Sequence, residues 1–263
     1  MENHQPVRAL EEVEFSEQAA LNVKLKKDAR ARWLAVLRGG TGFSPALWKG
    51  DLSLMRFKGN GQQMYTYKGN NTGNDVTGQH RLLTVEEMLS RMSGEYSLPS
   101  YLDMQTSGAP NLDEDRTLFN QSHTFAGNQL FKLGKDYQLT TRMLYANDRR
   151  TSDYLSHTEH FLADSLIVTE LKDETCIHTD VLTAEATLQA NTKSFFLKNT
   201  LGVDASWNSG NGWVSGTYPN REHTDTEKVK VSNRLQWIQN IGRRTFTLTS
   251  VNSYENKPQR MEI

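Results

Sequence analysis

This 263-residue sequence contains a single cysteine, Cys176, and that scarcity excludes several kinds of site. A lone thiol cannot form an internal disulfide framework, nor can it build a metal site that needs several cysteines. We interpret Cys176 as an incidental small residue. The sequence also lacks any apolar run of about 18 residues, which is the minimum for a membrane-spanning helix. A helical membrane protein is therefore excluded.

Neither sign of charge is in excess. Thirty lysines and arginines face 31 aspartates and glutamates, so the formal net charge is -1. No global field would draw the protein to nucleic acid or to an acidic substrate. We therefore predict no nucleic-acid partner. Residues 1–6 also lack the basic and then apolar regions of a secretory signal, so we expect the N-terminus of an exported form to lie upstream of this sequence.

What the sequence does contain is a unit that recurs about five times: a strand, a tight polar turn, a second strand, and a longer polar loop. Glycine, asparagine and aspartate tolerate the positive φ angles of hairpin turns, and they mark each tight turn. The five predicted turns are residues 27–30, 58–61, 133–136, 190–193 and 240–243.

The segments between these turns alternate apolar and polar residues, which is typical of strands. In residues 229–237, Val229, Val231 and Trp237 fall on one face, and lysine and arginine fall on the other. Residues 21–26 and 245–249 alternate in the same way. Such alternation lets a membrane barrel have a mean hydropathy of only -0.67, because its inward residues are polar. We predict strands of roughly 9 to 13 residues, longer than the usual strand of a soluble protein and close to a tilted membrane strand.

Aromatic residues gather near the tight turns and at the far ends of the strands. Amphipathic rings prefer the lipid headgroup level, so a barrel wall would have one aromatic girdle at each interface. Alternatively, aromatic residues are simply common in strands. The turn-side set is Trp33, Phe57, Phe131, Tyr137, Phe195, Phe196, Trp237 and Phe246, and the far set includes Trp48, Tyr145 and Trp207.

Long connections are predicted on the side opposite the tight turns, at residues 41–47, 70–117, 150–175 and 208–227. Short turns on one rim and long loops on the other are typical of outer-membrane barrels. Within the longest connection, Thr84 and Glu87 form a capping box that predicts a short helix over residues 84–92. The predicted fold class is thus all-β, a partial antiparallel up-and-down transmembrane β-barrel of about ten strands.

Catalytic motifs find little support. His157, Glu159 and His160 invite a metal site, but their spacing does not place two histidines on one helical face and no third ligand is identifiable. A zinc deaminase is excluded, because its signature needs a Cys-x-x-Cys pair that a single cysteine cannot supply. The glycines of residues 39–42 lack the lysine and the helix of a phosphate loop, so a flexible strand end is predicted there. We predict no enzyme activity, no metal and no cofactor, and the residues that bind a ligand stay unknown.

Lumen-facing charges are the remaining candidates for function. Lys24, Lys230 and Arg234 lie on the polar side of alternating strands. They could line a path for a solute, or they could only hydrate the interior of a barrel.

Three segments together resemble TonB-dependent receptor-like outer membrane proteins of the Bacteroidetes type. Residues 21–28 look like the first barrel strand and turn after the plug domain. Residues 48–73 resemble the next hairpin with its Asn-rich end, and residues 2–10 look like the last piece of a plug. The resemblance implies residues 1–18 as the end of a plug or linker and residues 19–263 as the first part of a barrel of about 22 strands.

The resemblance also implies a role and a location. The parent protein would be a receptor or transporter in the outer membrane of a Gram-negative bacterium. It would contact outer-membrane lipid, couple to TonB through an N-terminal region absent from this sequence, and import an unidentified small or oligomeric ligand. Two alternatives stay open: a non-transporting barrel for adhesion or assembly, and a soluble all-β ligand-binding module such as a sandwich.

Overall fold

The computed structural model of the chain describes residues 8–10, 32–76, 101–102, 104, 117–161, 166–215, 219–242 and 244–263. Apart from a short 3₁₀ helix, η1 (Arg8–Leu10), its regular elements are strands. These are β1 (Arg32–Gly42), β2 (Leu47–Lys58), β3 (Gly61–Asn70), β4 (Phe119–Leu133), β5 (Tyr137–Phe161), β6 (Leu166–Asn191), β7 (Phe195–Ser215), β8 (Asn220–Ile241), β9 (Arg244–Asn256) and β10 (Gln259–Glu262).

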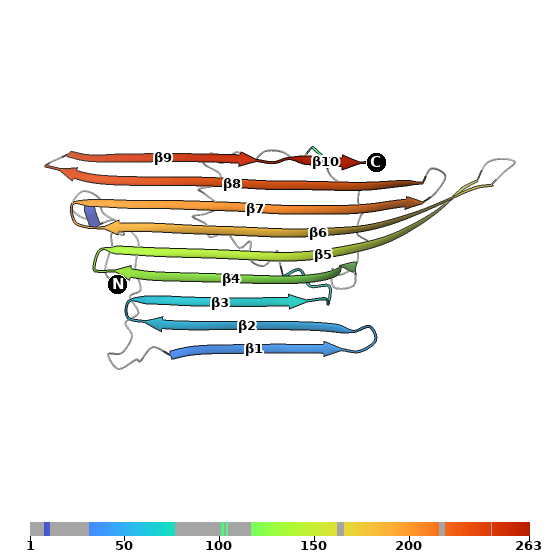
Figure 1. The fold of residues 1–263 in the computed structure, drawn as a ribbon, viewed down its shortest axis with the longest axis horizontal. Helices are drawn as coiled ribbons and strands as arrows, with labels where there is room; N and C mark the ends of the chain where they lie inside the picture. The colour runs from blue at the N-terminus through green and yellow to red at the C-terminus, as the bar shows by residue number, and fades with distance from the viewer. Residues whose placement is uncertain are drawn as a thin grey trace.

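All ten strands belong to one antiparallel sheet in which each strand pairs with the strand before it, except β10 (Figure 1). Both β9 and β10 pair with β8, and their registers match across the two residues that separate them. Pro258 lies in that interruption and has no N–H to donate to a ladder. The sheet is open, with β1 at one edge and β9 and β10 at the other. This confirms the predicted all-β, up-and-down fold of ten strands, without closure into a barrel.

Two rims follow from the topology, and we name them by their connections. The turn rim carries the tight turns at residues 59–60, 134–136, 192–194 and 242, which confirms four of the five predicted turns. Gly134 and Gly242 adopt φ angles of 88° and 63°, which favour glycine. The predicted turn at 27–30, the strand at 21–26 and the helix at 84–92 lie outside the described residues. In the part of the chain that is described, no helix is long and apolar enough to cross a membrane.

At the loop rim, opposite the turn rim, the structure corrects three of the four predicted long loops. The strands β1, β2, β3 and β9 have the predicted length, with 11, 12, 10 and 13 residues, whereas β4 to β8 are longer. β5 and β6 reach 25 and 26 residues, and their pairing continues to Phe161 and Leu166. Short connections replace the three predicted long loops. They are residues 43–46 between β1 and β2, 162–165 between β5 and β6, and 216–219 between β7 and β8. The predicted loops 150–175 and 208–227 are polar, but together they contain seven threonines, which are β-branched and suit strands. A paired hairpin also satisfies the backbone hydrogen bonds that a loop would leave to water.

The glycine-rich residues 39–42 form the end of β1, as predicted, with Gly39 opposite Gly50 in β2.

The only buried hydrophobic cluster among the described residues is small and lies near the turn rim. It joins Ala9 of η1 to Phe196 of β7 and Ile238 of β8. Arg8 of η1 forms an ion pair with Asp136 at 2.6 Å. The short helix η1 is therefore docked on the sheet, whereas most of the large apolar side chains that the structure describes remain exposed.

Candidate functional site

The two faces of the sheet differ in chemistry, and the register shows how. Residues paired across antiparallel strands share a face. We call one side the apolar face, because two successive rows on it are almost entirely apolar. One row joins Leu52, Tyr67, Phe125, Tyr145, Leu182, Ala205 and Val229, and the next joins Leu54, Tyr65, Gly127, Met143, Ala184, Val203, Val231 and Tyr254. The next row toward the turn rim is mixed and includes Gln63, Gln129 and Asn233 beside Leu201.

The opposite side, which we call the polar face, holds the alternate residues. One of its rows joins Ser53, Thr66, Ala126, Leu144, Thr183, Asp204, Lys230 and Glu255. Lys230 is buried on this face, and Arg234 lies on it four residues further along β8. The sequence thus placed both cations on the correct face, while Lys24 lies outside the described residues.

The apolar face is exposed to an extent that is unusual for a protein surrounded by water. Leu201, Phe246 and Leu248 each expose almost half of their surface, with fractions of 49%, 49% and 48%. Soluble monomers rarely expose contiguous apolar surface beyond a few hundred Å². No second sheet covers this face among the described residues. The described residues therefore leave this face uncovered.

Aromatic rings on the apolar face lie near the turn rim and again eight to twelve residues further along the strands. Tyr137 and Tyr145 are eight residues apart on β5, and Phe195 and Trp207 are twelve apart on β7. At about 3.3 Å per residue these intervals span about 26 and 40 Å along the strands. A tilt of roughly 35–45° would reduce them to heights of about 20 and 30 Å, which bracket the 25 Å apolar band of an outer-membrane barrel.

Two of the predicted girdle residues do not belong to this set. Phe57 pairs with Gln62 and Arg32, and Phe196 pairs with Ile238, so both lie on the polar face. Their proximity to a turn identified them in the sequence. Side chains alternate between the two faces along a strand, however, and at these two positions the side chain lies on the polar face. Phe196 has a different role, since it packs against η1.

Near the loop rim, the polar face carries a buried hydrogen-bonded group that we call the rim cluster. It consists of Asn70, Asp75, Asn120, Ser122, Asp148 and Arg150. The side chains come from β3, β4, β5 and the residues after β3, so their separation in sequence reaches 80 positions. Sequence analysis missed the cluster, because only the strand register brings these residues together.

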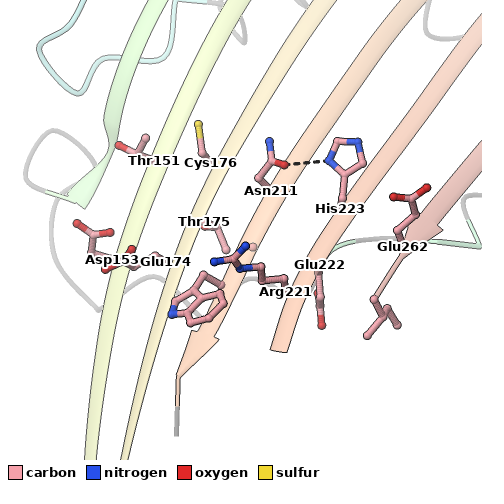
Figure 2. A pocket seen from close by; sticks show the side chains of 13 residues that line it. Thr151, Asp153, Glu174, Thr175, Cys176, Asn211, Arg221, Glu222, His223 and Glu262 are labelled. Atoms are coloured by element: carbon pink, nitrogen blue, oxygen red, sulfur yellow. Dashed lines mark hydrogen bonds between the residues drawn. The ribbon is translucent and has the colours of Figure 1, made fainter. Parts of the chain in front are cut away.

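On the apolar side, beyond the outer aromatic rings, lies an open depression of about 830 Å³. Figure 2 shows Thr151, Cys176, Asn211 and His223 on successive strands across it. The His223 ring is within 2.9 Å of the Asn211 side-chain oxygen. In the same depression, the guanidinium of Arg221 lies 4.6 Å from the Trp213 ring centroid. The depression holds polar and aromatic groups, but no arrangement in it has the geometry of a nucleophile with a base.

The histidines singled out in the sequence are separated by the strand geometry. His157 and Glu159 lie on one face of β5, and His160 lies on the other. The His157 ring nitrogens are 3.2 Å from a Glu159 carboxylate oxygen and 3.0 Å from one of Glu170. Among the described residues, no group of three or more histidine, cysteine, aspartate or glutamate side chains has a metal-holding arrangement.

The effect of these two carboxylates can be measured as a change in the pKa of His157. The hydrogen bond to Glu159 and then that to Glu170 raise the pKa of His157 above the ordinary value of an imidazole, about 6.5. Because the folded-state pKa is raised, the stabilising effect is present below about pH 6.5 and is lost as the pH rises through the folded-state pKa. We expect NMR titration of labelled histidine to show the raised pKa, and Glu159→Gln to lower it. A His157 pKa at or below 6.5 in the unmodified protein would contradict this arrangement.

Comparison with known proteins adds no family name: no family model and no curated protein matches the chain. The two faces of the sheet and the resemblance of the sequence are therefore the indications of function.

Proposed function

We propose that this chain forms part of the wall of an outer-membrane β-barrel in a Gram-negative bacterium. The observation that carries the proposal is a single up-and-down sheet with one exposed apolar face, which carries aromatic rings, and one polar face. Lipid would cover the apolar face, and the polar face would line the lumen. Further strands at the open edges would remove the unpaired edges that make an isolated sheet prone to aggregate.

The rims support an orientation for this wall. Outer-membrane barrels place short turns in the periplasm and long loops outside the cell. The turn rim would therefore be periplasmic, and the β5–β6 hairpin would project outside. That hairpin continues ten residue pairs beyond the last β4–β5 pair, from Ser152 to Phe161 of β5.

Within this wall, the favoured role is that of a TonB-dependent receptor or transporter for an unidentified ligand. The resemblance of residues 2–10, 21–28 and 48–73 to such receptors suggests this role. The docking of η1 on the polar face, near the turn rim, is what a plug-to-barrel connection at the periplasmic end would require. Energy would come from the inner membrane through TonB.

A growth comparison tests the transport role. We expect a strain lacking the full-length protein to share at least one growth defect with a strain lacking TonB, across a panel of carbon, iron and vitamin sources. The double deletion should be no worse than the TonB deletion on that source. Normal growth of the single-deletion strain on every source, or a defect that persists independently of TonB, would contradict energy-coupled uptake.

One observation favours a non-transporting adhesion or assembly barrel as the second candidate. The projecting β5–β6 hairpin exposes large apolar side chains, with Leu155 at 69% and Phe161 at 80%. Exposed apolar groups at the end of a projecting hairpin are suited to contact with another surface. Loss of surface attachment in the deletion strain, without a growth defect, would favour this role. A soluble sandwich has less support, since its apolar face would be covered by a second sheet.

A further inference from the structure

The chain that leaves β3 turns back over the polar face instead of continuing past the loop rim. Gly73, with a φ of 76°, allows the reversal. The Gly73 backbone N–H donates to the Asn120 side-chain oxygen at 3.0 Å. The side-chain amides of Asn70 and Asn120 both donate to the backbone oxygen of Asn74, at 2.9 and 3.2 Å. Residues 71–76 are thus held at their backbone by two strands of the sheet.

An ion pair also connects residues 71–76 to the sheet. Arg150 of β5 lies between two carboxylates, 3.1 Å from Asp75 and 2.5 Å from Asp148. Asp148 also accepts a hydrogen bond from Ser122 at 2.6 Å. Asp148 is only 5% exposed and Ser122 only 1%, so water screens the contact between them weakly, whereas the side chains of Arg150 and Asp75 are partly exposed. The rim cluster therefore attaches residues 71–76 to the strands beneath them.

A second part of the connection between β3 and β4 also lies on the polar face, but toward the opposite edge of the sheet, over β7 and β10. The backbone N–H groups of Tyr101 and Leu102 donate to the Gln259 side chain at 3.0 and 3.2 Å. Met104 packs directly on β7, where a Cβ on Gly210 would lie 2.1 Å from the methionine methyl carbon. Gly210 thus provides space that another residue would fill.

We propose that residues 71–76, together with Tyr101, Leu102 and Met104, form a constriction inside the barrel at its outer end, which sets the size of solutes that reach the lumen. The inference rests on the proposed function, because the polar face is the lumen wall only if the chain is a barrel wall. Both parts belong to the connection between β3 and β4, and both are fixed to the polar face of different strands. A loop that only received ligand outside the cell would need neither attachment.

Access of thiol reagents to the lumen provides the test, in whole cells that make the full-length protein. The background carries Cys176→Ser and Asn128→Cys, since Asn128 is exposed on the polar face of β4. A maleimide of about 0.5 kDa and a polyethylene glycol maleimide of about 5 kDa are compared. The large reagent cannot cross the outer membrane elsewhere, so its reaction reports on this opening alone. In the background protein, we expect the small reagent to react and the large one to be excluded.

Two variants should open the constriction, and each has a matched control on the opposite face. Arg150→Ala removes the ion pair with Asp75, and Gly210→Leu displaces Met104. The controls are the neighbours Arg149→Ala and Asn211→Leu, which lie on the apolar side of β5 and β7. We expect the large reagent to react at least about tenfold faster in both variants, equivalent to about 1.4 kcal/mol, and to stay excluded in both controls.

Every outcome bears on the proposal. If the large reagent stays excluded in both variants, or enters the background protein freely, the constriction is wrong. If the small reagent fails in all samples, the polar face is not reached from outside and the proposal is also overturned. Each sample is also compared on a gel before and after heating. A retained heat-dependent shift with unchanged access overturns only the constriction, whereas loss of the shift in the background protein overturns the proposed function.

Discussion

Leu201→Arg is expected to destabilise the protein in a membrane or detergent by about 2–4 kcal/mol, the cost of placing arginine on the lipid face of a barrel near its midplane. Leu201 lies on the apolar face in the middle of β7, between the Phe195 and Trp207 rings. It is 49% exposed in the sheet, so the substitution has room. The cost would come from removing arginine from water and not from crowding. Thermal loss of the folded band on a gel measures the effect.

The neighbouring Thr200→Arg supplies the matched control. Thr200 pairs with Arg234 on the polar face, where a further arginine would meet water in a barrel lumen. We expect a loss of only about 1 kcal/mol there, from the hydrogen bond to Thr187 and from repulsion by Arg234 across the strands. The opposite ranking, or equal effects of Leu201→Arg and Thr200→Arg, would mean that lipid does not cover the apolar face. In a soluble protein, Leu201→Arg would be harmless or would improve solubility.

Asp148→Ala is expected to cost about 2–3 kcal/mol in unfolding free energy. The substitution removes the acceptor for Ser122 and one of the two carboxylates at Arg150. Hydrogen bonds to charged groups contribute about 1.5–3 kcal/mol, and a buried partner left without its acceptor adds a desolvation cost. Equilibrium unfolding by urea in detergent, followed by tryptophan fluorescence, gives the difference.

Asp153→Ala tests whether burial is the cause. Asp153 lies on the same strand, on the apolar side and exposed. An exposed carboxylate gives an expected change below about 0.5 kcal/mol. If the two alanine variants unfold at the same urea concentration with equal slopes, the rim cluster does not stabilise the fold.

Much of the fold could be predicted from local patterns, because hairpin turns and two-residue alternation are local properties. The alternation of residues 229–237 placed Val229, Val231 and Trp237 together on the apolar face, as the register of β8 confirms. Lys230 and Arg234 followed on the polar face. These positions needed no information from distant parts of the chain.

Other features depend on which residues pair, and the sequence alone could not supply that. Residues 150–175 are polar and were predicted to form a loop, yet 25 pairs join β5 to β6 across that region and beyond it. Phe57 and Phe196 lie near turns but on the polar face, because one residue of offset in a strand changes the face. The rim cluster joins Asn70, Asn120 and Asp148 only through the registers of β3, β4 and β5.

The central claim is that this chain belongs to the wall of a closed membrane barrel, and fractionation with gel migration tests it most directly. Cells that make the full-length protein are separated into soluble, inner-membrane and outer-membrane fractions, and each fraction is run in detergent with and without boiling. We predict that the protein is found in the outer-membrane fraction alone and migrates faster when it has not been boiled. Recovery in the soluble fraction, with the same migration before and after boiling, would contradict the barrel and favour a soluble all-β binding module.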